Sequence, residues 1–124
     1  MKMELKEVKL NIHESGEYKN LYLNEIAGNG DFIILEKVDF ADARMLTQKD
    51  SEEPLTSKFG DEMFSCTAMY GEDKITFILY KSADEWNGCG DLGDKVKLIR
   101  KKEMYVDAKG KDRIKSTLLF EKVN

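Results

Sequence analysis

Residues 64–98 decide the fold class, and they read FSCTAMYGEDKITFILYKSADEWNGCGDLGDKVKL. Two runs rich in β-branched and aromatic residues, 64–70 and 74–80, flank Gly71-Glu72-Asp73, a pattern typical of a β-hairpin. Because strand residues alternate between two faces, every second residue of the hairpin is expected to point into the core. These inward residues are Phe64, Cys66, Ala68, Ile75, Phe77 and Leu79.

A short helix is predicted directly after this hairpin, over residues 82–86. Ser82 is a suitable N-cap, and Glu85 stands at the reciprocal position of a capping box. Gly88 and Gly90 then end the helix, and a glycine-aspartate turn leads into another strand.

The stretch upstream of the hairpin also predicts a strand. Residues 31–40 are rich in β-formers, and the alternation slips near Glu36-Lys37, which predicts a bulge in a long first strand that residues 41–47 extend. Residues 48–62 form a polar loop that contains Pro54, the only proline of the chain.

The last third of the chain is strongly basic. Residues 95–106 and 113–123 predict two strands joined by a basic turn that contains a glycine. Between positions 95 and 122, ten Lys or Arg residues stand against four acids, a local net charge of +6, whereas the whole chain carries −4. Such a split indicates a basic surface on one structural element, and the phosphates of a polyanion are the first partner to consider for it.

A length of 124 residues fits a single domain with a core of its own. We expect residues 1–30 to be an N-terminal extension, with a short strand within residues 5–12 and two turns of helix over residues 20–27. Residues 31–124 are expected to form the domain itself.

The predicted order of elements resembles a known family. Five strands with one helix between the third and the fourth are similar to the oligonucleotide/oligosaccharide-binding barrel, the OB-fold. The segment from Trp86 to Leu98, with its glycine-aspartate turn and Lys-Val-Lys-Leu-Ile run, resembles the helix-to-strand junction of single-stranded DNA-binding OB domains of the archaeal, replication-protein-A-like and single-domain bacteriophage types. The resemblance covers residues 31–123. It implies an all-β, five-stranded barrel that binds single-stranded DNA.

Binding of this kind needs cations along the phosphates and flat side chains that stack on bases. Aromatic residues beside the basic ones are therefore candidates, although Trp86 and the hairpin tyrosines are also candidates for the core. Tyr105 is the strongest single candidate, because it lies between two basic clusters in a polar hairpin. The predicted nucleic-acid-binding residues are Tyr70, Lys74, Tyr80, Lys81, Trp86, Lys97, Arg100, Lys101, Lys102, Tyr105, Lys109, Lys111, Arg113 and Lys115.

Other classes of function have weak support. His13 is the only histidine and stands far in sequence from Cys66 and Cys89, so no catalytic residues and no zinc site are predicted, and both thiols are expected to be free. The glycines form no nucleotide-binding motif, so we expect no cofactor. The sequence also shows no membrane-spanning run and no apolar signal segment at its start, which favours a cytoplasmic protein without a membrane partner.

The sequence therefore predicts a non-catalytic, largely sequence-independent single-stranded DNA-binding protein of replication, recombination or repair. Two alternatives remain open: an RNA-binding OB domain, since contacts to the 2′-hydroxyl cannot be read from a sequence, and a protein-interaction module that uses the acidic half, especially residues 48–62. A homo-oligomer and a replication or repair partner are both compatible with this sequence.

Overall fold

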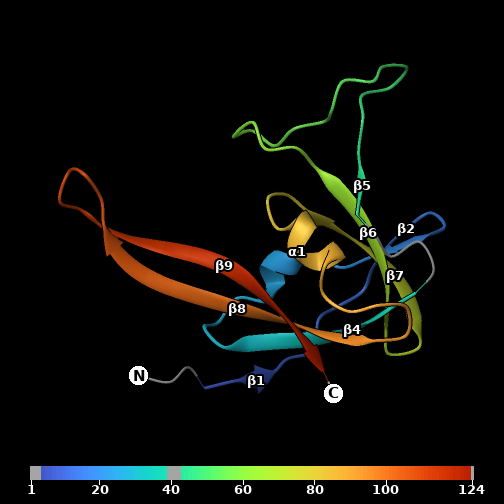
Figure 1. Cartoon of the computed structure of the whole chain (residues 1–124), viewed down its shortest axis with the longest axis horizontal. Coiled ribbons are helices and arrows are strands. Elements are labelled where there is room, and N and C mark those ends of the chain that lie inside the picture. Colours follow the sequence, from blue (N-terminus) through green and yellow to red (C-terminus); the bar gives the residue numbers. More distant parts are fainter. Residues whose placement is uncertain (1–3, 39–42, 124) are drawn as a thin grey trace.

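The computed structural model describes residues 4–38 and 43–123. The described residues form one open sheet of nine strands with a short helix and a 3-10 turn (Figure 1). The elements are β1 (Lys6–Glu7), β2 (His13–Ser15), β3 (Tyr18–Asn20), η1 (Leu23–Glu25), β4 (Asp31–Lys37), β5 (Arg44–Met45), β6 (Phe64–Tyr70), β7 (Asp73–Leu79), α1 (Ala83–Asn87), β8 (Lys95–Val106) and β9 (Asp112–Val123). The prediction of an all-β protein is confirmed.

The strands follow the order β2-β3-β7-β6-β4-β8-β9, with β1 alongside β4 and β5 alongside β6. The hairpin predicted over residues 64–80 is present as the antiparallel pair β6–β7, which runs in register from Phe64 opposite Leu79 to Tyr70 opposite Asp73. Asp73, predicted to lie in the turn, is the first residue of β7. Strand β4 lies at the centre, where it pairs antiparallel with both β6 and β8. A second long hairpin, β8–β9, ends the sheet.

The predicted five-stranded barrel is not confirmed. The path of paired strands ends at β9, and closure of the five strands β7-β6-β4-β8-β9 would require β7 to pair with β9. That pairing is not found among residues 4–38 and 43–123, in which β7 pairs with β6 and β3 while β9 pairs with β8.

The hydrophobic core lies between the curved sheet and α1. Trp86 of α1 is fully buried, and its ring meets Phe77 of β7 edge to face at a centroid distance of 5.2 Å. The alternate residues predicted to point inward from β6 and β7 are buried, except for Phe64, which is half-buried. The segment before Asp31 is part of the same core, to which it contributes Leu10, Leu21, Leu23 and Ile26.

The bulge predicted near Glu36-Lys37 is wrong, because β4 keeps its alternation and Lys37 occupies a core-facing position. Lys37 is only 3% exposed. Its ammonium group donates hydrogen bonds to the carbonyl oxygens of Trp86, Asn87 and Gly90 and lies 4.7 Å from the centroid of the Trp86 ring. Lys37 therefore links β4 to the end of α1. Because a lysine stands at a core-facing position, the alternation of apolar residues looks broken there in the sequence.

Two local predictions about helices also need correction. The two turns of helix expected over residues 20–27 are a single 3-10 turn, η1. The Ser82 side chain makes no capping hydrogen bond, so the predicted capping box is absent, although α1 begins one residue later as expected. The predicted strand extension over residues 41–47 falls partly outside the described residues, and within them only Arg44–Met45 forms a strand.

Candidate nucleic-acid interface

The hairpin β8–β9 extends well beyond the body of the protein (Figure 1). Its strands pair without interruption from Lys95 opposite Val123 to Val106 opposite Asp112. We call residues 101–117 the arm. Because the register has no bulge, consecutive residues of the arm lie on opposite faces.

Contacts with the body identify the two faces of the arm. Leu118 and Phe120 pack against the core, and they stand opposite Arg100 and Leu98 in the register. This is the inner face. The outer face therefore carries the odd-numbered residues of both strands, which include Lys97, Lys101, Glu103, Tyr105, Arg113 and Lys115.

The outer face presents an exposed aromatic ring among cations. Tyr105 is 50% exposed and stands directly opposite Arg113. Lys115 stands opposite Glu103, and the ammonium of Lys101 lies 2.7 Å from a carboxylate oxygen of Glu103. That hydrogen bond from Lys101 lowers the pKa of Glu103, so this acid is ionised and partly balances the cations around it.

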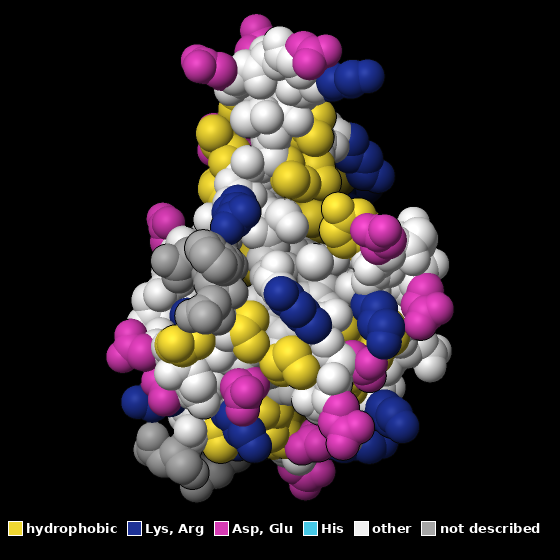
Figure 2. Space-filling view, turned by 90° about the vertical axis from the view of Figure 1, so that its right-hand side faces the viewer, with side chains coloured by type: hydrophobic (Ala, Val, Ile, Leu, Met, Phe, Trp, Pro, Cys, Tyr) yellow, Lys and Arg dark blue, Asp and Glu magenta, His cyan; other side chains and the backbone are white. Residues whose placement is uncertain are grey.

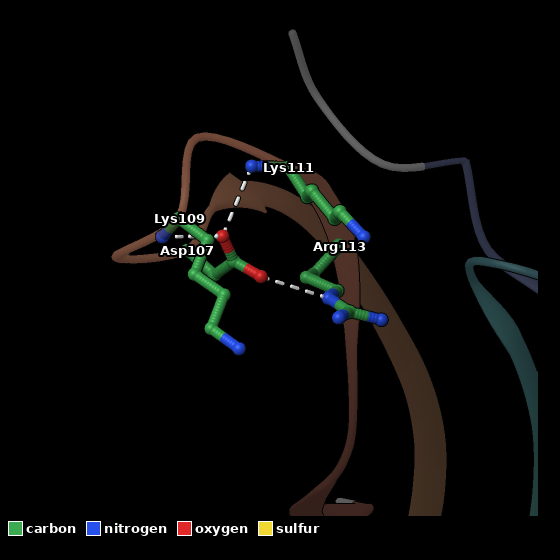
Figure 3. Close-up of polar contacts among 4 residues, drawn as sticks. All are labelled: Asp107, Lys109, Lys111 and Arg113. Atoms are coloured by element: carbon green, nitrogen blue, oxygen red, sulfur yellow. Dashed lines mark hydrogen bonds and ion pairs between the residues drawn. The ribbon is translucent and has the colours of Figure 1, made fainter.

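Asp107 organises the basic turn at the tip of the arm (Figure 3). One carboxylate oxygen accepts hydrogen bonds from the backbone N–H groups of Lys109 and Lys111, both at 2.9 Å. The other oxygen accepts one from Nε of Arg113 at 3.0 Å. The bond from the Lys111 backbone, followed by the bond from Arg113, lowers the pKa of Asp107. The turn is thus held by its own acid, while the side chains of Lys109 and Lys111 extend into solvent.

A groove lies where β7 and β9 remain unpaired. Its volume is about 1020 Å³, and its walls are residues 76–79 of β7, Tyr80 and residues 116–118 of β9, with residues 20–24, 57–59 and 61 at its rim. Of the described residues, three exposed aromatic side chains border it: Tyr22 (51% exposed), Phe59 (80%) and Tyr80 (40%). Its cations include Lys58 and Lys81.

The structure brings seven of the fourteen predicted binding residues to the arm. Lys101, Tyr105, Arg113 and Lys115 share the outer face, Lys109 and Lys111 lie at the tip, and Lys102 lies on the inner face. Lys97 is nearer the body, with its ammonium 5.0 Å from the centroid of the Phe32 ring. Tyr80 and Lys81 border the groove instead, and Lys81 lies 3.6 Å from Asp61.

The structure separates two predicted residues from this surface. Tyr70 and Lys74 flank the turn of the β6–β7 hairpin, at the opposite end of the molecule from the arm tip (Figure 1). The Tyr70 ring packs against the core, and its hydroxyl accepts a hydrogen bond of 3.0 Å from the N–H of Leu10. Figure 2 views the molecule from this side, and there basic and acidic side chains are interspersed without a patch of one sign.

Two further predicted residues have other roles. The prediction that Trp86 stacks on bases is wrong, because this side chain lies in the core and is 0% exposed. The guanidinium of Arg100 is committed to the protein's own backbone: Nε donates to the carbonyl oxygen of Ile26 at 2.7 Å and Nη2 to that of Leu23 at 2.9 Å. Burial lowers the pKa of Arg100. Arg100 therefore links β8 to the segment before β4.

The sequence analysis missed two exposed rings beside the groove. Tyr22 belongs to the lead-in, whose weak pattern gives no sign of proximity to β7, and its ring stacks on His13 at a centroid distance of 4.4 Å. Phe59 has a recognisable signal, since a phenylalanine between Lys58 and Gly60 in a polar loop has no core to enter.

No protein-family model, curated protein or solved structure matches this chain. Across residues 4–38 and 43–123, no group of three or more His, Cys, Asp or Glu side chains is arranged to hold a metal ion. Cys66 is buried and Cys89 is half-buried, and both are free thiols. None of the helices described is long and apolar enough to cross a membrane.

Proposed function

We propose that this protein binds single-stranded DNA without catalysis and with little sequence preference, through the outer face of the arm. The observation that carries the proposal is the half-exposed Tyr105 ring directly opposite Arg113, with Lys101 and Lys115 on the same face. A base stacks on the ring, and the cations on both sides neutralise the adjoining phosphates.

The choice of a single strand over a duplex rests on the exposed Tyr105 ring, since a two-stranded ribbon by its shape also fits a duplex groove. Reading of a duplex groove commonly uses a basic helix, and the one α-helix of the described residues, α1, has two acids in its first turn and no base in its last. A stacking ring on an extended ribbon needs an unpaired base, which only a single strand offers.

The order of the strands supports an OB-like arrangement as part of this proposal. Strands β4, β6 and β7, then α1, then β8 and β9 follow one another as the family resemblance implies, with the helix between the third and fourth strands. In this arrangement the groove is the seam between the third strand, β7, and the fifth, β9. Tyr80 and Phe59 lie beside this seam. Bases of a bound DNA strand that continues past the arm can stack on these two rings.

The test is titration of a fluorescently labelled oligothymidylate, followed by anisotropy at two salt concentrations. Loss of one base–aromatic stack costs about 1–3 kcal/mol, so Tyr105→Ala should weaken binding by about 5- to 150-fold, whereas Tyr105→Phe should change it little. Neither change removes a cation from the phosphates, so the dependence of affinity on salt should stay the same in both variants.

Lysine variants test the electrostatic part separately. Lys101→Ala with Lys102→Ala, and Lys115→Ala alone, should weaken binding equally for all sequences. The slope of log affinity against log salt should become shallower by about 0.7 for each phosphate that is no longer neutralised. Lys9→Ala removes an exposed lysine away from the arm and is the matched control. Oligouridylate in the same assay decides between DNA and RNA as the preferred ligand.

Two outcomes contradict the proposal. If Tyr105→Ala lowers the melting temperature but leaves the affinity unchanged, the ring is structural. If neither oligothymidylate nor oligouridylate binds, the alternative of a protein-interaction module is favoured, with the loop of residues 48–62, in which Phe59 is exposed, as its contact surface.

A further inference from the structure

Strand β9 leaves a long backbone edge unpaired. It has 12 residues, its register with β8 is unbroken, and among the described residues no strand pairs with its other side. Natural edge strands are usually protected by being short, by a bulge, by a proline or by charged side chains, and β9 has only the charges, which lie toward its two ends. Beside residues 116–118 the groove keeps β7 away from this edge, so the side on which another strand would add is open.

We propose that β9 pairs antiparallel with β9 of a second copy of this chain, around a two-fold axis through Thr117. Pairing of one strand with itself gives an isologous interface, in which each contact occurs twice. The proposal goes beyond nucleic-acid binding and does not depend on it.

The charges along β9 select this register. With Thr117 at the axis, Arg113 stands opposite Glu121 of the partner, and Asp112 stands opposite Lys122 of the partner. The smallest shift that keeps opposite residues on the same face is two residues. In one direction this shift leaves only Lys115 opposite Glu121 of the partner, and in the other direction it leaves no ion pair within β9. The register through Thr117 therefore places the most opposite charges together.

The middle of the strand has no charge to oppose pairing. Residues 116–120 are Ser-Thr-Leu-Leu-Phe, and in the proposed register Ile114, which is 65% exposed, faces Phe120 of the partner. The ion pairs are exposed and each contributes little. Arg113 also binds Asp107, and Lys122 lies 3.5 Å from Asp94, within its own chain. Backbone hydrogen bonds and apolar contacts therefore provide most of the affinity, and the charges determine the register.

The first measurement is the mass of the native full chain in solution, by light scattering or sedimentation over a wide range of concentration. We expect twice the mass of one chain at the upper concentrations. A single-chain mass throughout would overturn the proposal.

The second measurement identifies the strand and its register by disulfide cross-linking of Thr117→Cys. Residues opposite each other in an antiparallel pair have Cα atoms about 4.5–5.5 Å apart, which a disulfide can span. The variant carries Cys89→Ser, while the buried Cys66 is retained. We expect mild oxidation to convert most of the chain to a covalent dimer.

Ile114→Cys in the same background is the matched control. In the proposed register the two copies of residue 114 lie six residues apart along the strands, about 20 Å, which is too far for a disulfide. Circular dichroism before oxidation verifies that both variants are folded. Equal cross-linking of the two variants would show that any dimer uses another surface, and the proposal would be wrong.

Discussion

Replacement of Arg100 by Met tests whether this residue supports the fold or binds phosphate. The change removes two hydrogen bonds from a charged donor, each of which contributes about 1.5–3 kcal/mol. It also leaves the carbonyl oxygens of Leu23 and Ile26 without that donor. We therefore expect a loss of about 3 kcal/mol in the free energy of unfolding. At about 4 °C per kcal/mol for a domain of this size, the melting temperature should fall by about 12 °C.

Two companion variants sharpen the test of Arg100. Arg100→Lys keeps the charge but lacks the planar fork that reaches two carbonyl groups, so it should lose about half of the same stability. Lys102→Met, two residues along the same face, is exposed and should change stability by less than about 0.5 kcal/mol. The assay is thermal unfolding by circular dichroism, together with the salt dependence of oligothymidylate binding. An unchanged melting temperature with a shallower salt dependence in Arg100→Met would refute the structural role and restore the phosphate role.

Three further predictions concern other parts of the molecule. Lys37→Met keeps the apolar stem but removes the donor to three carbonyl groups at the end of α1. The free energy of unfolding measured with urea should therefore fall by about 3 kcal/mol, and a loss below about 1 kcal/mol would contradict the linking role. Burial raises the pKa of the Cys66 thiol to about 12. A thiol reagent at pH 8 should therefore label Cys89 alone in the folded protein and both cysteines after unfolding, and rapid labelling of Cys66 in the folded state would refute its burial. The lowered pKa of Asp107 means that its contribution to the arm tip is complete above its ordinary pKa of 3.8 and is lost as the pH falls through the lower folded value. In an NMR titration the two backbone N–H signals that it binds should shift only in that acidic range, and a midpoint above 3.8 would be inconsistent with the structure.

The elements with strong local patterns were predictable from the sequence. The β6–β7 hairpin has alternating apolar residues on both strands and a glycine turn, and the bounds of β8 match the prediction of residues 95–106. The exposure of Tyr105 was predictable from the turn beside it, which is too polar to form a core.

The features that depend on distant partners were not predictable. Lys37 looks like a break in alternation because its partners, the carbonyl groups at the end of α1, lie about 50 residues away in the sequence. The bonds from Arg100 to the carbonyl groups of Leu23 and Ile26 span more than 70 residues. The groove exists because β7 and β9 do not pair. The local sequence pattern of either strand does not show whether the two strands pair with each other.

The central position of β4 determines how the chain can fold. The β6–β7 and β8–β9 pairs connect residues that are close in the sequence, whereas β4 joins the two hairpins through pairs such as Phe32 with Ile99. Contacts with large sequence separation form late, because closing a long loop costs entropy before any contact repays it. We therefore expect the two hairpins to form early and independently, and the insertion of β4 between them to set the folding rate. Substitutions within β4 should then slow refolding, whereas substitutions at the arm tip should leave the refolding rate unchanged and affect only local hydrogen exchange.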